Sequence, residues 1–285
     1  MNSTLNHALA EALVADRRRA RTARPRARGR GRILLVVALA VATLVILPTI
    51  AEAATVHQDG RTPHRLLVQA GPDETNLVSV EGRRSVVIRD DGTPLSVARV
   101  PTCMRIDAHA VSCSAVRRIE LDLGDGPDVA AVSTPREVEI EGGSGPDRYI
   151  ALAGDWSSRV DFDGGIGMDV ANYGFAAAGV DVSVDLSAGD GRPGDDDRIR
   201  RNVETVFGSA FDDVLTGGPH SEEMRGLDGD DRITGGAGED VLMGGDGNDR
   251  IHAIDGEPDA IDCGGWLSDW AAIDIGGEAS VTGCG

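Results

Sequence analysis

The chain of 285 residues contains no lysine, and aromatic residues make up only 3 % of it. Without lysine it has no G-x-x-x-x-G-K-[ST] loop to hold a nucleotide phosphate. It also lacks the H-E-x-x-H zinc helix and the G-x-S-x-G nucleophile elbow. Its many carboxylates form no identifiable glycosidase pair. The sequence therefore carries no recognisable signature of a hydrolase or a nucleotide-binding enzyme.

The body of the chain is strongly acidic. Residues 54–285 hold 44 acidic residues and only 19 arginines. A surface of this charge repels nucleic acid and anionic membranes, and it attracts divalent cations. We therefore expect metal ions as partners and no nucleic acid.

The N-terminus has the layout of a secretory signal peptide. A basic stretch at 17–32 precedes the apolar run ILLVVALAVATLVIL at 33–47, and Pro48 and an A-x-A site at 51–53 follow. The alternative is an uncleaved signal anchor over 33–51, which is close to the minimum length for a membrane span. Pro48 and the A-x-A site favour cleavage, which predicts a secreted protein with no membrane contact afterwards.

Four cysteines remain in the predicted mature part, and four allow three pairings. Short loops close at lower entropic cost, which favours Cys103–Cys113 and Cys263–Cys284. Export to an oxidising compartment agrees with disulfides, although free buried thiols are the alternative for either pair. The six histidines show no zinc-ligand spacing with these cysteines.

A tandem array of five nine-residue blocks runs from Gly208 to His252, and its last three blocks read GLDGDDRIT, GGAGEDVLM and GGDGNDRIH. Glycines at positions one, two and four predict a sharp turn with φ > 0 at each, because no Cβ opposes it. The last three residues of a block predict a very short strand. The sixth residue is always acidic: Asp213, Glu222, Asp231, Asp240 and Asp249. The eighth is always apolar: Leu215, Met224, Ile233, Leu242 and Ile251.

Two blocks predict one coil of eighteen residues, so residues eighteen apart stack at about 4.8 Å, one strand spacing. The apolar columns are expected to be Leu215, Ile233 and Ile251 on one side, and Met224 and Leu242 on the other. The acid ladders are expected to be Asp213, Asp231 and Asp249, and Glu222 and Asp240.

Stacked carboxylates repel one another by about 3–4 kcal/mol at an effective dielectric near 20, so the ladders require cations. One carboxylate and two carbonyls from each of two turns supply six oxygens, which suits Ca²⁺ better than the rigid octahedron of Mg²⁺. The alternative is a disordered Gly/Asp-rich tail. The low aromatic content agrees with it, but the apolar residue at the eighth position of every block does not. The block GGPHSEEMR at Gly217–Arg225 departs from the pattern, which puts its site in doubt.

The flanking regions are predicted to be β-structure as well. Residues 54–115 form a small N-terminal β region with strands at Arg65–Gly71, Asn76–Gly82 and Ser85–Gly92. Residues 116–207 form irregular coils of the same solenoid, because strand-like runs precede glycine turns that end in acids 19 and 22 residues apart. These acids are Asp128, Asp147 and Asp169. A further strand is expected at Val180–Leu186, and Asp195–Asp197 is expected to be a solvated turn.

Residues 253–285 are predicted to cap the solenoid, since the last coil otherwise exposes apolar side chains and open strand edges. Trp266, Trp270, Ile273 and the Cys263–Cys284 disulfide are the candidates for this cap. A ligand platform built from the two tryptophans is the alternative.

On these residues the chain resembles secreted hemolysin-type (RTX-like) calcium-binding nonapeptide-repeat proteins, particularly those of actinobacteria. The specific part is 208–252, and a softer likeness covers most of 70–285. The resemblance implies that the sixth-position carboxylates and the carbonyls of the glycine turns bind Ca²⁺. It marks Asp213, Gly226, Asp228, Gly229, Asp231, Gly235, Gly236, Gly238, Asp240, Gly244, Gly245, Asp246, Gly247 and Asp249, and more weakly Asp128, Asp147 and Asp169. Many members carry a protease or lipase, for which this chain has no motif. Many members also leave the cell through an exporter that reads a C-terminal signal, and this chain departs from them by having an N-terminal signal.

The sequence thus predicts an all-β protein: a parallel β-roll or β-helix solenoid with a small N-terminal β region and a disulfide-stapled C-terminal cap. The expected regions are 1–53 (signal peptide), 54–115, 116–207, 208–252 and 253–285. We expect a secreted, monomeric, non-catalytic protein whose β-roll folds on binding extracellular calcium. The alternatives are a calcium-stiffened adhesin or matrix protein that presents 54–115 to a protein or glycan, and a hydrolase with an unrecognised site in 54–205.

Overall fold

The structure, a computed structural model, divides into the units Met1–Ile50 and Ala51–Gly285. It describes residues 54–58, 62, 64–71, 74–98, 100–154, 157–185, 187–265, 268–274 and 280–285. The predicted signal peptide, 1–53, lies outside these residues. The regular secondary structure of the described part is entirely β, and this part contains no helix suited to crossing a bilayer.

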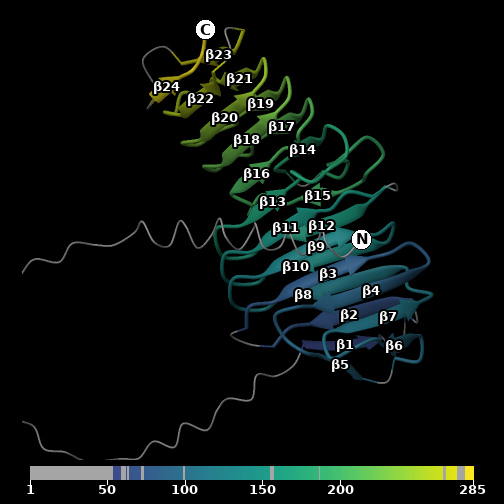
Figure 1. The fold of residues 1–285 in the computed structure, drawn as a ribbon. Helices are drawn as coiled ribbons and strands as arrows, with labels where there is room; N and C mark the ends of the chain where they lie inside the picture. The colour runs from purple at the N-terminus through teal and green to yellow at the C-terminus, as the bar shows by residue number, and fades with distance from the viewer. Residues whose placement is uncertain are drawn as a thin grey trace, which may run out of the picture. The chain divides into compact units, whose positions relative to one another are not determined.

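The first side of the coils is one twelve-stranded sheet, in the order β24-β22-β20-β18-β16-β13-β11-β9-β3-β4-β7-β6. Its strands are β3 (Leu77–Glu81), β4 (Ser85–Asp90), β6 (Cys103–Arg105), β7 (Ala110–Ser114), β9 (Val129–Ser133), β11 (Arg148–Ala151), β13 (Val170–Asn172), β16 (Thr205–Phe207), β18 (Glu223–Asp228), β20 (Val241–Asp246), β22 (Ala260–Gly264) and β24 (Ser280–Thr282). From β3 to β24, apart from β4, β6 and β7, the strands pair in parallel, one coil upon the next (Figure 1).

The second side is divided between two sheets. The seven-stranded sheet has the order β15-β12-β10-β8-β2-β1-β5, with β1 (Ala54–Gln58), β2 (Arg65–Gln69), β5 (Leu95–Ala98), β8 (Arg118–Asp122), β10 (Glu137–Glu141), β12 (Arg159–Asp163) and β15 (Arg198–Ile199). The five-stranded sheet has the order β14-β17-β19-β21-β23, with β14 (Asp181–Ser183), β17 (Val214–Thr216), β19 (Arg232–Thr234), β21 (Arg250–Ala253) and β23 (Trp270–Ile273). An isolated parallel bridge between Val184 and Ile199 connects them.

The eighteen-residue register is confirmed in the repeat region. Leu215 pairs with Ile233 and Ile233 with Ile251, while Met224 pairs with Leu242 on the opposite side. All five side chains are at most 1 % exposed. The predicted apolar columns therefore form the core between the two sides, since parallel pairing in register places residues eighteen apart directly above one another.

The predicted N-terminal β region is continuous with the solenoid. Strand β2 pairs in parallel with β8, and β3 pairs in parallel with β9, so these two strands already form a coil. Antiparallel strands β1 and β4 close its end. The antiparallel neighbours β6 and β7 are joined by the predicted Cys103–Cys113 disulfide. The three strands expected in this region are present as β2, β3 and β4.

The expectation that Asp195–Asp197 is a solvated turn is wrong for two of the three acids. Asp197 is fully buried, where its carboxylate accepts hydrogen bonds from Val160 N (2.8 Å) and Ser158 Oγ (3.0 Å). The Asp195 side chain is 4 % exposed and pairs with Arg192. These contacts fasten the loop between β14 and β15 to the second side of the coils, so the acids are structural.

The C-terminal end contains the predicted Cys263–Cys284 disulfide, which ties the end of β22 to the residues after β24. Ile261 and Cys263 are buried. Trp270 and Ile273, expected to cover the last coil, are instead 53 % and 40 % exposed, and Trp266 lies outside the described residues. The disulfide is thus the better-supported part of the predicted cap.

Candidate metal centre

Two ladders of acidic side chains run through the coils, each acid standing directly before a strand. The ladder of the twelve-stranded side contains Asp128, Asp147, Asp169, Glu204, Glu222, Asp240 and Asp259. The ladder of the five-stranded side contains Asp213, Asp231, Asp249 and Asp269. All except Glu204 are buried. The structure thus joins the three acids predicted in 116–207 to the same ladder as Glu222 and Asp240.

Each ladder is held by hydrogen bonds from one coil to the next. Asp231 Oδ1 accepts from the backbone N–H of Asp213 at 2.8 Å, and Asp249 Oδ1 accepts from that of Asp231 at 2.9 Å. In the other ladder Asp240 Oδ1 accepts from Glu222 N at 2.8 Å. One carboxylate oxygen of each residue is therefore used in stacking, and the amide dipole offsets part of the repulsion between neighbouring acids.

The second oxygen of these acids has no such partner. Asp231 Oδ2, Asp240 Oδ2, Asp249 Oδ2 and Glu222 Oε1 are buried and receive no hydrogen bond. A buried carboxylate oxygen without a donor is costly, and in native proteins it calls for an explanation such as a bound ion. The repeats therefore present a row of oxygens that are suited to a cation.

The glycine at position one faces this free oxygen. A Cβ placed on Gly226 would lie 2.0 Å from Asp231 Oδ2 and 2.6 Å from the carbonyl oxygen of Gly244, one coil further on. A Cβ on Gly244 would lie 2.3 Å from Asp249 Oδ2 and 2.5 Å from the carbonyl oxygen of Cys263. We call this space beside the position-one α-carbon the oxygen notch. A side chain there would fill it.

The glycines have different roles at different positions of the block. At positions two and four of the last three blocks φ is positive, as at Gly236 (+112°) and Gly238 (+124°), whereas Gly218, at position two of the irregular block, does not adopt it. The expectation of φ > 0 at position one is wrong, because no position-one glycine of the five blocks adopts it. Glycine is required at position one by the close approach of oxygens and at positions two and four by the backbone conformation. Leu227 occupies a position two with φ of +90°.

Two acids depart from this arrangement. Asp213 Oδ2 accepts from the Ser209 N–H, and its Oδ1 accepts from Val180 N (2.7 Å) and Ser209 Oγ (2.8 Å), so both oxygens have protein donors. Glu222, from the irregular block, accepts from Gly218 N at 3.1 Å through Oε2 and keeps only Oε1 free. The turns of Asp213 and Glu222 are therefore less suited to binding a cation than the turns of Asp231, Asp240 and Asp249.

Any ion in the notch must take most of its ligands from the backbone. Within the described residues, no three His, Cys, Asp or Glu side chains are grouped so that they could hold a metal. Asp228 and Asp246, marked by the sequence, are in register on β18 and β20 with exposed side chains, and the Asp246 carbonyl oxygen accepts from Gly229 N at 2.8 Å. One carboxylate oxygen with several carbonyls is a ligand set that Ca²⁺ accepts.

The environment of the ladders raises the pKa of their carboxyl groups. Burial is the largest cause; it raises the pKa of Asp231 to about 7, and neighbouring Asp213 and Asp249 add to the effect. Burial likewise raises the pKa of Asp240 and Asp249 to about 6, against the lowering effect of the backbone hydrogen bonds. A raised pKa means that the buried charge is disfavoured unless a proton or a cation accompanies it.

Sequence reasoning missed three members of the ladders: Glu204, Asp259 and Asp269. Asp259 and Asp269 are 19 and 20 residues from Asp240 and Asp249, whose backbone N–H groups donate to them. Glu204 precedes Glu222 by the regular eighteen residues, but it is 35 residues from Asp169, whose N–H donates to it, and it lies outside the five blocks. An acid directly before a short strand was the signal that could have identified them.

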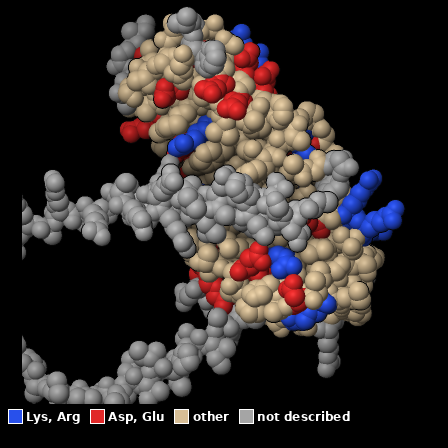
Figure 2. Space-filling model, viewed as in Figure 1, with Lys and Arg blue, Asp and Glu red and all other residues tan. Residues whose placement is uncertain are grey.

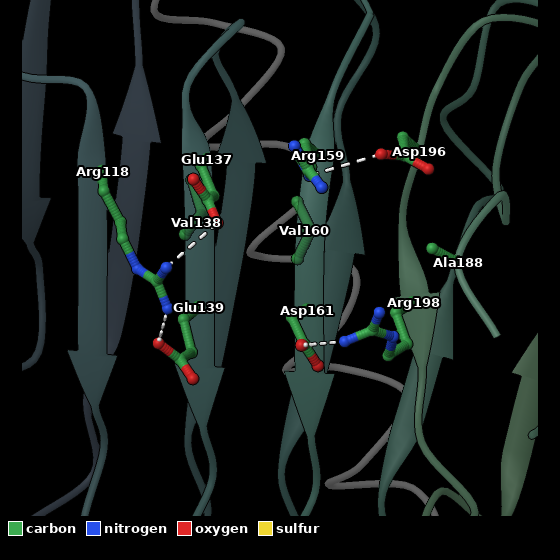
Figure 3. A pocket seen from close by; sticks show the side chains of 10 residues that line it. All are labelled: Arg118, Glu137, Val138, Glu139, Arg159, Val160, Asp161, Ala188, Asp196 and Arg198. Carbon is green, nitrogen blue, oxygen red and sulfur yellow. Dashed lines mark hydrogen bonds and ion pairs between the residues drawn. The ribbon is translucent and has the colours of Figure 1, made fainter. Parts of the chain in front are cut away.

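The hollow drawn in Figure 3 lies away from the ladders, on the outer face of β8, β10, β12 and β15. Its charged side chains pair with one another: Arg118 with Glu137 and Glu139, Arg159 with Asp196, and Arg198 with Asp161. Acidic and basic side chains also lie side by side near the N-terminal strands in Figure 2. This surface is explained by ion pairing.

The comparisons with known proteins agree with the geometry of the repeats. Residues 202–222 and 216–251 match the family model of the RTX calcium-binding nonapeptide repeat (4 copies). No curated protein sequence matches the chain. The matched residues contain both the oxygen notches and the free oxygens of Glu222, Asp231, Asp240 and Asp249. Residues 202–251 therefore carry RTX calcium-binding nonapeptide repeats.

Proposed function

We propose that this protein is secreted and non-catalytic, and that its repeat coils close on extracellular calcium. Folding and binding are then one process, because the ligand oxygens come together only when the coils stack. Calcium at the outside of the cell stabilises the folded state by mass action.

The observation that carries the proposal is the free second oxygen of the buried acids. Asp231, Asp240 and Asp249 are at most 1 % exposed, and each accepts one stacking hydrogen bond through Oδ1 and leaves Oδ2 without a donor. A hard divalent cation beside this oxygen removes the cost of burying it and offsets the raised pKa. Ca²⁺ suits the mixed set of carboxylate and carbonyl oxygens better than Mg²⁺, which retains its waters.

The proposed ligands are the free oxygens of Asp231, Asp240 and Asp249 together with carbonyls of the glycine turns. The turn residues proposed are Gly226, Asp228, Gly229, Gly235, Gly236, Gly238, Gly244, Gly245, Asp246 and Gly247. Asp213, which the sequence also marks, is a weaker ligand than these acids, because Ser209 N and Ser209 Oγ already donate to its carboxylate.

Secretion is supported by the signal-like leader at 1–53 and by the two disulfides, which are typical of oxidising compartments. The absence of catalysis is supported by the missing hydrolase motifs and by the paired charges of the surface hollow. The region boundaries at 115, 207 and 252 remain part of this proposal.

A calcium titration of the chelator-treated full chain, followed by far-UV circular dichroism, tests the proposal. We expect the β signal to rise as calcium reaches the millimolar range of extracellular modules. Magnesium at the same concentrations is the control and should produce a much smaller rise. A spectrum that stays constant through millimolar calcium would contradict calcium-coupled folding, and an equal response to magnesium would contradict the assigned ion.

A further inference from the structure

Two glycine turns outside residues 202–251 have the same construction as the matched repeats. Gly142–Asp147 reads GGSGPD and Gly164–Asp169 reads GGIGMD. They precede β11 and β13, which pair in parallel. Although their acids are 22 residues apart, the strands after them are in direct register, because the additional residues lie on the opposite side of the coil.

The acids of these turns stack as those of the repeats do. Asp147 Oδ1 accepts from the backbone N–H of Asp128 at 3.0 Å, and Asp169 Oδ1 accepts from that of Asp147 at 2.8 Å. The second oxygens, Asp147 Oδ2 and Asp169 Oδ2, are buried without a donor, in side chains that are at most 1 % exposed. Each turn therefore contains a free oxygen of the kind found at Asp231.

The oxygen notch is present here too. A Cβ on Gly142 would lie 2.6 Å from Asp147 Oδ2 and 2.2 Å from the carbonyl oxygen of Gly164, one coil further on. The corresponding distances at Gly226 are 2.0 Å to Asp231 Oδ2 and 2.6 Å to the Gly244 carbonyl oxygen. A carboxylate oxygen and a carbonyl oxygen thus approach the position-one glycine in both places, at Gly142 and at Gly226.

The backbone conformation of the first turn follows the same rule, and in the second turn Gly165 does so (+96°) while Gly167 does not. Gly143 and Gly145, at positions two and four, have φ of +97° and +125°, close to +112° and +124° at Gly236 and Gly238. The preceding turn differs, because buried Leu123 stands at its position one. Asp128 therefore has a free Oδ2 but no notch of this kind, and it is left out of the inference.

We propose that the turns Gly142–Asp147 and Gly164–Asp169 hold a calcium ion outside the matched repeats, bound by Asp147 Oδ2 and the Gly164 carbonyl oxygen together with other carbonyls of the two turns. The inference rests on the proposed function, because it transfers the repeat site to a second place in the fold. Calcium would then stabilise the coils between β10 and β13 as well as those of the repeats.

The number of calcium ions on the full chain, counted by native mass spectrometry, tests this site. Asp147→Asn is nearly isosteric and retains an oxygen that can accept from Asp128 N, but its amide opposes a cation. We expect it to bind one ion fewer than the parent chain. Asp231→Asn, in the matched repeats, should also lose calcium, and the double variant should show both losses. Asp125→Asn, which removes an exposed charge from the neighbouring turn, should retain every ion.

The outcomes separate the two proposals. If Asp231→Asn loses calcium while Asp147→Asn retains all of it, the site at 142–169 is overturned and the repeat sites stand. If neither variant loses an ion, or the parent chain binds none, the proposed function fails as well. Gly142→Ala, which fills the notch and keeps both acids, should also lose one ion, and it decides the question if Asp147→Asn does not fold.

Discussion

At the scale of single residues, the repeat depends on glycine for two separate physical reasons. Position one needs it because a carboxylate oxygen and a carbonyl oxygen approach the α-carbon, as at Gly226. Positions two and four need it because φ is positive, as at Gly245 and Gly247. The sequence pattern alone showed the glycines but could not separate these causes, because close approach between coils is a tertiary contact.

Leu227 provides a test of the second reason. It is a leucine at position two with φ of +90°, where a Cβ costs about 1–2 kcal/mol. We therefore expect Leu227→Gly to be more stable than Leu227→Ala by about 1 kcal/mol, because both remove the side chain and only glycine relieves the backbone. Urea unfolding in saturating calcium measures the difference.

Met243, on the adjacent strand β20, provides the control for this pair. Its φ is not positive, so Met243→Gly should be less stable than Met243→Ala by about 0.5–1 kcal/mol, the usual order in a strand. If the alanine variant has the higher free energy of unfolding at both positions, positive φ is not a source of strain at Leu227.

At the scale of strands, each short strand contributes one inward side chain, and the stacking of coils joins these into a core. Ile233 lies between Leu215 and Ile251 in the column of the five-stranded side and is 1 % exposed. Ile233→Ala removes contacts with both neighbours and leaves a cavity, so it should lower the free energy of unfolding by about 2–5 kcal/mol.

Val214→Ala is the matched control for Ile233→Ala, because Val214 lies on the neighbouring strand β17 but is 37 % exposed. We expect Val214→Ala to lower the free energy of unfolding by about 0.5 kcal/mol, as most surface substitutions do. Urea unfolding of both variants in calcium gives the comparison. Equal costs would mean that the column does not form the core of these coils.

The elements that could be predicted from the sequence are those with a constant period. The columns of Leu215 and Met224 follow from eighteen-residue spacing, and both are present. The positions of Asp259 and Asp269 could not be predicted in this way, because they lie 19 and 20 residues beyond the preceding acids of their ladders. Glu204 does follow the period, eighteen residues before Glu222, but it lies outside the five blocks, where the glycine pattern is absent. Buried Asp197 escaped prediction because its partners, Ser158 and Val160, belong to a distant strand and the segment before it.

At the scale of the whole described unit, the acid ladders connect coils that the sequence divides into regions. The ladder of the twelve-stranded side runs from Asp128 to Asp259 and crosses the predicted region boundaries at 207 and 252. At its N-terminal end stands Asn76, whose backbone and side-chain amides donate to Asp128 and add no further charge. Ions bound in one region should therefore stabilise its neighbours through shared coils.

The ladders also determine how pH should act on the chain when calcium is removed. Burial raises the pKa of Asp147, Glu222 and Asp231 to about 7, above the ordinary range of carboxyl groups. A pKa that is raised in the folded state means that protonation favours folding. The resulting stability is fully present below the unfolded pKa of about 4 and is lost as pH rises through about 7. In chelator, the urea midpoint should therefore fall steadily from pH 5 to pH 8.

Calcium should reverse the contribution of the ladders, because the ion replaces the proton at the same oxygens, and its stabilising effect should be larger at pH 8 than at pH 5. Asp197, outside the ladders, also has a pKa raised to about 7 by burial, so Asp197→Asn is needed to separate its contribution. In that variant the chelated chain should still lose stability from pH 5 to pH 8, and calcium should restore most of it. A chelated chain that is more stable at pH 8 than at pH 5 would show that the ladder acids are not held in the buried, cation-requiring state that their geometry indicates.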